Sequence, residues 1–325
     1  MAKFPSQRKM LYQTGALSND TYTQLSSGGS SGPLNLPKDL SILNRRGYAS
    51  TTRKGVPLVY QCKVDFYLHD EDGQGPSTAL NADLQATLKI DGCQNNWVMR
   101  NAAVKWHAAR EEMYRRAGVR KSERGAYAHE IRYNYDSSGD TWLVPIDGNG
   151  DAFTGGTWDD STFSTQDDAS FTLRLVGTGT DTEAASAPTV LTIGHEYLAS
   201  RSQVPSDSNL ESNDTPSDFS YLNDLLDDSE MPIANKDDIR DFAQAEQDNP
   251  PYDEFTAADT DHDITEPVEL GRAIAGFGNA YGSTIVEIPF GLAKMRATVF
   301  DAADTNVNPS GLVCVEVLDI FEMQG

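Results

Sequence analysis

The sequence has 325 residues, of which 38% are hydrophobic, so it is long enough to bury a large core without disulfide bridges. Its formal net charge of −23 indicates a strongly acidic surface. No run of eighteen apolar residues is present, and the first residues lack the apolar core of a signal peptide. We therefore expect neither a membrane span nor ordinary secretion, and no contact with a membrane.

Charge is distributed unevenly along the chain. Residues 1–54 hold eight basic and two acidic residues, and residues 97–124 hold eight basic and three acidic ones. All of the net negative charge therefore comes from the rest of the chain. This segregation predicts two surfaces that face different surroundings. The alternative, a halophilic or marine protein kept soluble by its acidity, explains the acidic part but not the basic start.

Residues 1–54 show no sustained hydrophobic period and include a Gly/Ser-rich run at 26–33. We expect them to form a flexible basic arm with a short helix near residues 8–12. Lysine and arginine on such an arm bind nucleic-acid phosphates without reading sequence. The residues expected to do so are Lys3, Arg8, Lys9, Arg45, Arg46, Arg53 and Lys54.

Residues 55–199 read as the first part of a β-sandwich with one helix. Residues 56–69 and 80–90 alternate apolar and polar side chains, which predicts two strands. Further strand signals lie at 127–135, 142–146, 170–176 and 188–198, separated by loops rich in Gly, Asp, Ser and Thr. Strands at this spacing are typical of an all-β sandwich.

A helix is predicted over about residues 96–117. An asparagine at 95 or 96 can cap its start, Gly118 can end it, and apolar residues recur at helical spacing between them. Its end is crowded by the basic residues Arg115, Arg116, Arg120, Lys121 and Arg124. These form either a solvated helix end matched to the helix dipole or a contact with nucleic acid or another subunit.

The chain changes character over residues 200–281, an acidic stretch that we interpret as an insertion or exposed loop region with two short helices at 219–226 and 239–245. Residues 282–325 return to strands. Alternation at 283–290 and 293–300 predicts half-buried strands, and the last run, 312–321, is apolar on both faces. That run needs cover from both sides, as in a sandwich or barrel.

No catalytic constellation is recognisable. The sequence has no phosphate-binding loop, no dinucleotide-binding glycine motif, no HExxH and no GxSxG, and its five histidines are scattered, so we expect no enzyme. The three cysteines lie far apart without the spacing of a zinc site and are expected to be buried thiols.

Two acidic loops resemble cation sites. Asp259, Asp261 and Asp263 match the start of an EF-hand, but Ile264 and Leu270 stand where that motif needs glycine and glutamate. The loop at residues 147–151 fails in the same two places. These loops are either solvated or hold a structural Ca²⁺ loosely, and no other cofactor is expected.

A basic Gly/Ser-rich start, a first strand at 56–69 and the closing segments 287–300 and 313–323 resemble the coat proteins of small icosahedral viruses. The closing segments are similar to those of environmental circular single-stranded DNA viruses. The resemblance implies one eight-stranded jelly roll, with helix 96–117 and the acidic stretch inserted. It implies a virion protein, made in the host cytoplasm or nucleus, that assembles with copies of itself around viral nucleic acid, expected to be single-stranded DNA. The arm would face inward, so deleting residues 2–54 should leave the fold intact.

Two other readings remain. One is a calcium-dependent carbohydrate-binding or adhesive β-sandwich, in which Trp142 and Trp158 would be stacking platforms; this requires exposed tryptophans on one flat face. The other is a double-barrel coat subunit, which requires more strands than residues 200–280 supply.

Overall fold

The three-dimensional structure is a computed structural model. It describes residues 5–15, 17, 22–27, 30–69, 84–120, 122–125, 130–136, 142–155, 158–164, 170–177, 180–181, 190–202, 266–276, 280–301 and 310–324. The chain divides into two compact units, residues 1–197 with 264–325 and residues 198–263. Of the second unit the structure describes residues 198–202, which belong to helix α3 (Ile193–Ser202).

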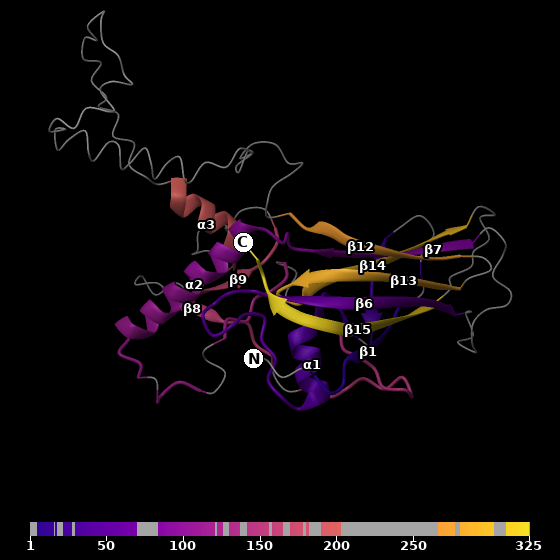
Figure 1. Ribbon diagram of the computed structural model, residues 1–325, viewed down its shortest axis with the longest axis horizontal. Helices are drawn as coiled ribbons and strands as arrows, with labels where there is room; N and C mark the ends of the chain where they lie inside the picture. Colours follow the sequence, from indigo (N-terminus) through magenta and orange to yellow (C-terminus); the bar gives the residue numbers. More distant parts are fainter. Residues whose placement is uncertain are drawn as a thin grey trace, which may run out of the picture. The chain divides into compact units, whose positions relative to one another are not determined.

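Two antiparallel sheets form the body of the first unit (Figure 1). The first sheet has the strand order β1 (Lys9–Gln13), β15 (Ser310–Glu322), β6 (Leu58–His69) and β13 (Tyr281–Pro289). The second sheet has the order β12 (Val268–Gly276), β7 (Leu84–Gly92), β14 (Leu292–Asp301) and β2 (Thr23–Gln24), and β5 (Leu34–Asn35) also pairs with β14. The fold is therefore mainly β, with antiparallel sheets packed together and few helices, as the alternating sequence predicted.

Alternation along the strands places one apolar face of each sheet in a shared core. Val313, Val315 and Val317 of β15 are fully buried, and Val64 of β6 and Leu88 of β7 belong to the same cluster. Each fully buried side chain of this size stabilises the fold by roughly 1.5–3 kcal/mol relative to its exposed state. The period-two pattern thus determined which face of each strand points inward.

Most consecutive long strands lie in different sheets: β6 is followed by β7, and β12 to β15 alternate between the sheets, whereas β7 and β12 are neighbours in the second sheet. The shortest crossing is a turn in which the amide of Gly291 donates to the carbonyl oxygen of Ile288 at 3.1 Å. Pro289 fixes one backbone angle of this turn, while Phe290 and Gly291 have φ angles of 58° and 69°. Phe290 tolerates this conformation because its ring is fully buried and packs edge-on against another ring.

The edge strands β12 and β13, which belong to different sheets, come very close at one point. A Cβ atom at Gly282 would lie 2.4 Å from the carbonyl oxygen of Ile274. Only glycine leaves room for the two backbones here, so the sandwich is nearly closed along this side.

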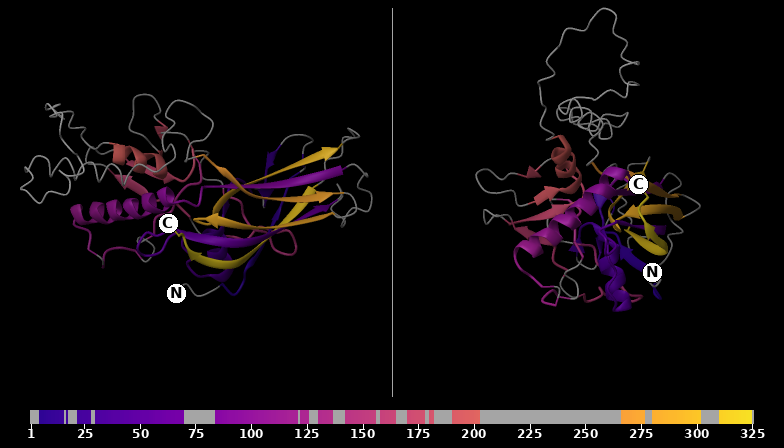
Figure 2. Two further views of the ribbon diagram at one scale, coloured as in Figure 1. Left: turned by 45° about the horizontal axis from the view of Figure 1, so that its top comes forward. Right: turned by 60° about the vertical axis from the view of Figure 1, so that its left-hand side comes forward.

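A second core lies at one end of the sandwich (Figure 2). Most of its residues lie between Cys93 and Tyr197, in a segment that contains α2 (Trp97–Arg116), the start of α3 and a small sheet. The small sheet has the order β10 (Thr180–Asp181), β11 (Val190–Thr192), β9 (Ser170–Arg174) and β8 (Thr162–Ser164), with β11 and β9 parallel. Met99 of α2 and Leu173 of β9 pack in this core with Phe290 and Leu292 of the sandwich.

The predicted helix is confirmed. The side-chain oxygen of Asn96 accepts a hydrogen bond from the amide of Met99 at 2.9 Å, which caps the first turn of α2. Gly118 follows the last turn with a φ angle of +70°, as a glycine at a helix end commonly does.

The prediction of a flexible amino-terminal arm is wrong for the described residues. The predicted helix near residues 8–12 is instead strand β1, which pairs with β15. Strands β2 and β5 pair with β14, β3 (Ser26–Ser27) pairs with β4 (Ser30–Ser31), and residues Leu36–Asn44 form helix α1. Leu25, Leu34 and Leu40 are buried in the sandwich core. Leu25 stands alone between polar residues and Leu34 follows Pro33, so composition alone did not reveal that each one reaches the core.

Three further expectations need correction. The described residues within 127–135 and 142–146 form isolated bridges at Asn134 and Ile146 rather than strands. The strand predicted at 188–198 is shortened to β11, because helix α3 starts at Ile193. The sheet resumes at Val268, inside the stretch predicted to be an acidic insertion up to residue 281. The helices predicted at 219–226 and 239–245 lie outside the described residues.

Candidate functional site

The predicted arm residues do not form one cluster. Lys9 makes an ion pair with Glu316 on the neighbouring strand β15, at 3.4 Å. The backbone carbonyl of Arg8 accepts a hydrogen bond from β15, and Arg53 and Lys54 lie in an exposed turn before β6. Lys3 lies outside the described residues. Arg45 and Arg46 are different, because they line a pocket together.

This pocket, which we call the α1 pocket, lies at the carboxyl end of helix α1 and has a volume of about 330 Å³. Three separate segments of the chain contribute to it: α1 with the turn after it, the segment at residues 130–132, and Trp158. Its charged and aromatic lining residues are Lys38, Arg45, Arg46, Tyr48, Glu130, Arg132 and Trp158.

Local hydrogen bonds fix the part of the α1 pocket that carries Arg45 and Arg46. Arg45 adopts the left-handed conformation, with φ 48° and ψ 43°, and ends the helix. The carbonyl of Ser41 accepts hydrogen bonds from the backbone amides of both arginines, and the Ser41 hydroxyl accepts one from Tyr48 at 2.9 Å. The backbone carrying the two guanidinium groups is therefore held in place.

A buried carboxyl group anchors α1 to the first sheet. Asp39 is fully buried, and the hydroxyl of Tyr12 on β1 donates to its Oδ2 atom at 2.6 Å. Burial raises the pKa of Asp39 to about 7, against the opposing effects of Lys38 and the Tyr12 hydroxyl. Burial also lowers the pKa of Lys38.

The far wall of the α1 pocket carries the acid Glu130 and the base Arg132. Glu130 is buried and accepts a hydrogen bond from the amide of Ser50 at 3.1 Å, and burial raises its pKa to about 7. The guanidinium carbon of Arg132 lies 4.4 Å from the centre of the Trp158 ring, a cation–π contact. The indole nitrogen of Trp158 is buried and has no acceptor among the described residues.

The second predicted basic group, at the end of α2, is largely neutralised by neighbouring acids. Arg115 and Arg116 both contact Glu112, at 2.6 and 2.8 Å, and these hydrogen bonds lower the pKa of Glu112 to about 2. Arg124 pairs with Glu111 at 2.7 Å and lies over the ring of Tyr114. The carboxylate of Glu123 accepts a hydrogen bond from the backbone of Arg120, and Lys121 lies outside the described residues.

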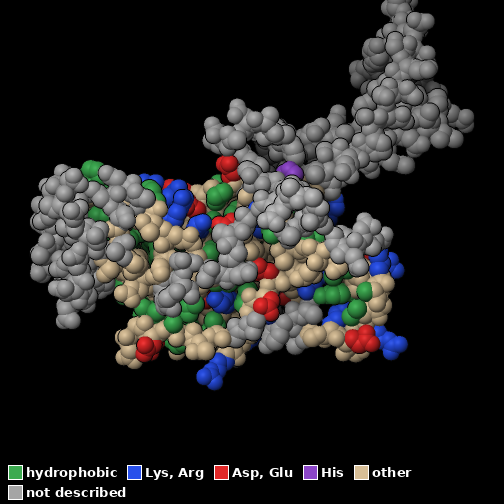
Figure 3. Space-filling view, turned by 180° about the vertical axis from the view of Figure 1, so that it is seen from behind, with side chains coloured by type: hydrophobic (Ala, Val, Ile, Leu, Met, Phe, Trp, Pro, Cys, Tyr) green, Lys and Arg blue, Asp and Glu red, His purple; other side chains and the backbone are tan. Residues whose placement is uncertain are grey.

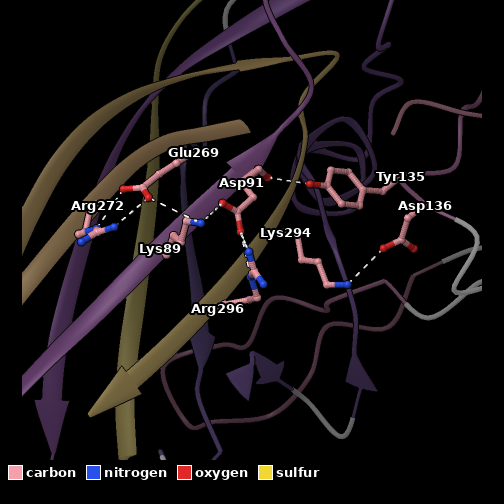
Figure 4. A network of polar contacts seen from close by, with 8 residues as sticks. All are labelled: Lys89, Asp91, Tyr135, Asp136, Glu269, Arg272, Lys294 and Arg296. Carbon is pink, nitrogen blue, oxygen red and sulfur yellow. Dashed lines mark hydrogen bonds and ion pairs between the residues drawn. The ribbon is translucent and has the colours of Figure 1, made fainter. Parts of the chain in front are cut away.

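The outer face of the second sheet also carries paired charges (Figure 4). Asp91 on β7 is nearly buried and contacts Arg296 on β14, at 2.5 Å, and Lys89 at 3.2 Å. The same network continues to Glu269 with Arg272 at the β12 side, and Lys294 pairs with Asp136. These contacts fix neighbouring strands and leave no cation of this network without an acid.

The face of the molecule in Figure 3 likewise shows Lys and Arg side chains interspersed with Asp and Glu. The α1 pocket differs from the paired arginines at the end of α2 and from the charged network on the second sheet. In the part of the chain that the structure describes, no carboxylate lies within ion-pair distance of Lys38, Arg45 or Arg46.

The predicted cation loops receive no support as metal sites. Oδ1 of Asp147 accepts hydrogen bonds from the amides of Asn149 and Asp151, at 2.8 and 2.9 Å, which lower its pKa. Asp259, Asp261 and Asp263 lie outside the described residues. Within the described ranges, no three His, Cys, Asp or Glu side chains are grouped so that they could hold a metal ion.

The tryptophans do not form the exposed platform that a sugar-binding module requires. Trp142 is buried, and Trp97, Trp106 and Trp158 are partly buried.

Cys62 and Cys93 are buried thiols, as predicted, and burial raises their pKa values. No helix among the described residues is long and apolar enough to cross a membrane.

Sequence reasoning identified Arg45 and Arg46 but missed their partners in the α1 pocket. From the sequence, Lys38 is one of the basic residues near the amino terminus and has no assigned role. Trp158 is a candidate only for stacking against a sugar ring. Glu130 and Arg132 lie in a segment that the pattern presented as a strand. No local signal joins residues some 90 to 120 positions apart, so only the tertiary structure brings them together.

No protein-family model, curated protein or solved structure matches this chain.

Proposed function

We propose that the chain is a structural subunit that assembles with copies of itself into a closed icosahedral shell around nucleic acid, as the coat proteins of small viruses do. Its nucleic acid is expected to be single-stranded DNA and its location the virion. The observation that carries the proposal is a group of exposed apolar side chains on the sandwich.

Five large apolar side chains are exposed among the described residues: Tyr22, Tyr67, Ile274, Ile285 and Phe300. The strand register places Tyr67, Ile274 and Phe300 in the half of the sandwich away from the second core. Ile285, 62% exposed on edge strand β13, lies near the middle. Tyr67 and Ile285 belong to the first sheet, and Ile274 and Phe300 belong to the second. Exposed apolar side chains on both sheets favour contact with other protein surfaces, and the edge strands β12 and β13 offer unpaired backbone groups beside two of them. A shell subunit has such a partner in every neighbouring copy.

The strand pairing supports a jelly roll as the finer description of the fold. In a jelly roll the first strand lies beside the last, and the second lies beside the next to last. Counted along the chain, the first strand of the two sheets, β1, pairs with the last, β15, and the second, β2, pairs with the next to last, β14. These are the two pairings that the jelly roll requires at its carboxyl end.

Assembly is tested by the double variant Ile274→Gln/Ile285→Gln. Both side chains are exposed, so we expect an unchanged melting temperature but loss of closed particles in negative-stain microscopy and of the assembled species in light scattering. The matched control is Glu287→Gln/Glu322→Gln, two exposed positions on β13 and β15. Dispersed wild-type monomers at high protein concentration would contradict the proposal, as would normal particles from the Ile variant.

A further inference from the structure

We propose that the α1 pocket binds a phosphate group. The inference goes beyond shell assembly and does not depend on it, because it concerns the lining of one pocket within a single chain. It assigns a ligand class to residues that the folded amino-terminal segment holds in place.

The charge of the α1 pocket is the first argument. Four of its five charged lining residues are basic, although the whole chain has 26 Lys and Arg against 49 Asp and Glu. The four are Lys38, Arg45, Arg46 and Arg132, and they come from segments far apart in the sequence. Arg115, Arg116 and Arg124 near the end of α2 and Arg296 on β14 pair with carboxylates, whereas Lys38, Arg45 and Arg46 have none within ion-pair distance in the described structure. A phosphate would supply the missing negative charge.

The single acid of the α1 pocket opposes an anion only weakly. The Glu130 carboxyl group is buried and already accepts the amide of Ser50. Its raised pKa of about 7 keeps it largely protonated in mildly acidic solution. The carboxyl end of α1 also carries partial negative charge, but the Ser41 carbonyl there is already bonded to two backbone amides.

The shape and the donors of the α1 pocket fit a small phosphate-bearing ligand. A volume of about 330 Å³ is within the range of pockets that hold small molecules. Arg132 is held against the Trp158 ring and its backbone is bonded on both sides to Ser161, so this guanidinium is positioned before a ligand arrives.

Two sources can present this chemistry: a free phosphate compound and the phosphodiester backbone of a nucleic acid. Binding is therefore measured with two probes on the full chain, inorganic phosphate by calorimetry and a labelled oligothymidylate by fluorescence anisotropy. Binding of phosphate alone identifies a small phosphate compound as the source. Binding of both probes in the same pocket identifies nucleic acid.

The decisive variant is Arg45→Gln/Arg46→Gln. We expect it to weaken binding of the probe roughly tenfold or more, since each arginine would donate charge-assisted hydrogen bonds. The matched control, Arg115→Gln/Arg116→Gln, removes two exposed arginines next to each other at the end of α2 and should change affinity less than twofold. Melting curves and particle assembly should be unchanged in both variants. No binding of either probe at millimolar phosphate would overturn the inference while leaving shell assembly untouched. Equal binding by the two variants would overturn it as well.

Discussion

At the residue scale, the surroundings of Asp39 and Gly282 in the sandwich predict measurable effects on stability. Asp39 is a carboxyl group buried in an otherwise apolar core, where one oxygen accepts the Tyr12 hydroxyl and the other has no partner among the described residues. Gly282 lies where two strand backbones nearly touch. Neither feature is visible in the sequence, because each depends on a neighbour that is far away along the chain.

Asp39 predicts a pH dependence of stability. Its pKa is about 7 in the folded protein and 3.8 in its ordinary state, so the folded protein binds a proton more tightly than the unfolded chain. The contribution of Asp39 to stability is therefore greatest at low pH and is lost as the pH rises from about 4 to 7, by at most about 1.4 kcal/mol per pH unit. Glu130 acts in the same direction. Urea unfolding between pH 5 and 8 should show this decline in the wild type.

The variant Asp39→Asn should reduce that decline, since asparagine does not titrate, while the exposed control Asp159→Asn should leave it as in the wild type. An equal slope for the Asp39 variant and the wild type would refute the role of Asp39.

Gly282 predicts a steric effect. A methyl group at this position meets the backbone of Ile274 at 2.4 Å, and backbone atoms cannot rotate away as a side chain can. We expect Gly282→Ala to lower the free energy of unfolding by about 1–3 kcal/mol. Gly15→Ala is the control, because nothing lies within 4 Å of the added atom there. Equal melting temperatures for the two variants would mean that β12 and β13 can move apart without a measurable loss of stability, and would contradict this prediction.

At the scale of elements, strand β1 holds the amino-terminal segment in the first sheet. It pairs with β15 over five positions, and its Met10 and Tyr12 are buried while Lys9 is exposed. The structure therefore reverses the expectation that residues 2–54 can be deleted without harm to the fold.

Removing residues 2–13 should destabilise the protein by several kcal/mol, because two large buried side chains are lost, each at a cost of about 2–5 kcal/mol. The deletion also exposes the edge of β15, so we expect aggregation as well. Chemical denaturation and light scattering measure both effects. The control Lys9→Ala removes only a surface ion pair and should cost no more than about 1 kcal/mol. A deletion variant that unfolds at the wild-type denaturant concentration would restore the flexible-arm interpretation.

At the scale of the whole molecule, the sequence predicted those parts whose pattern is local. Strands β6, β7, β13 and β14 follow from alternation, β15 follows from its continuous apolar run, and α2 follows from its caps and apolar stripe. The amino-terminal segment was misjudged because isolated leucines such as Leu34 carry no period. The small sheet was only partly anticipated because its strands are two to five residues long. The basic residues singled out from the sequence include Arg45 and Arg46, but Lys9, Arg115, Arg116 and Arg124 pair with acids after folding, and the α1 pocket required residues from three segments.

The position of β15 in the first sheet has a consequence for biosynthesis. This strand is the last of the described strands to be synthesised, yet it lies between β1 and β6, which are among the first. While the ribosome is still translating the middle of the chain, β1 has no strand to pair with and β6 lacks its longest partner. We therefore expect the nascent polypeptide to stay open, and to need protection by chaperones, until residues 310–322 have emerged.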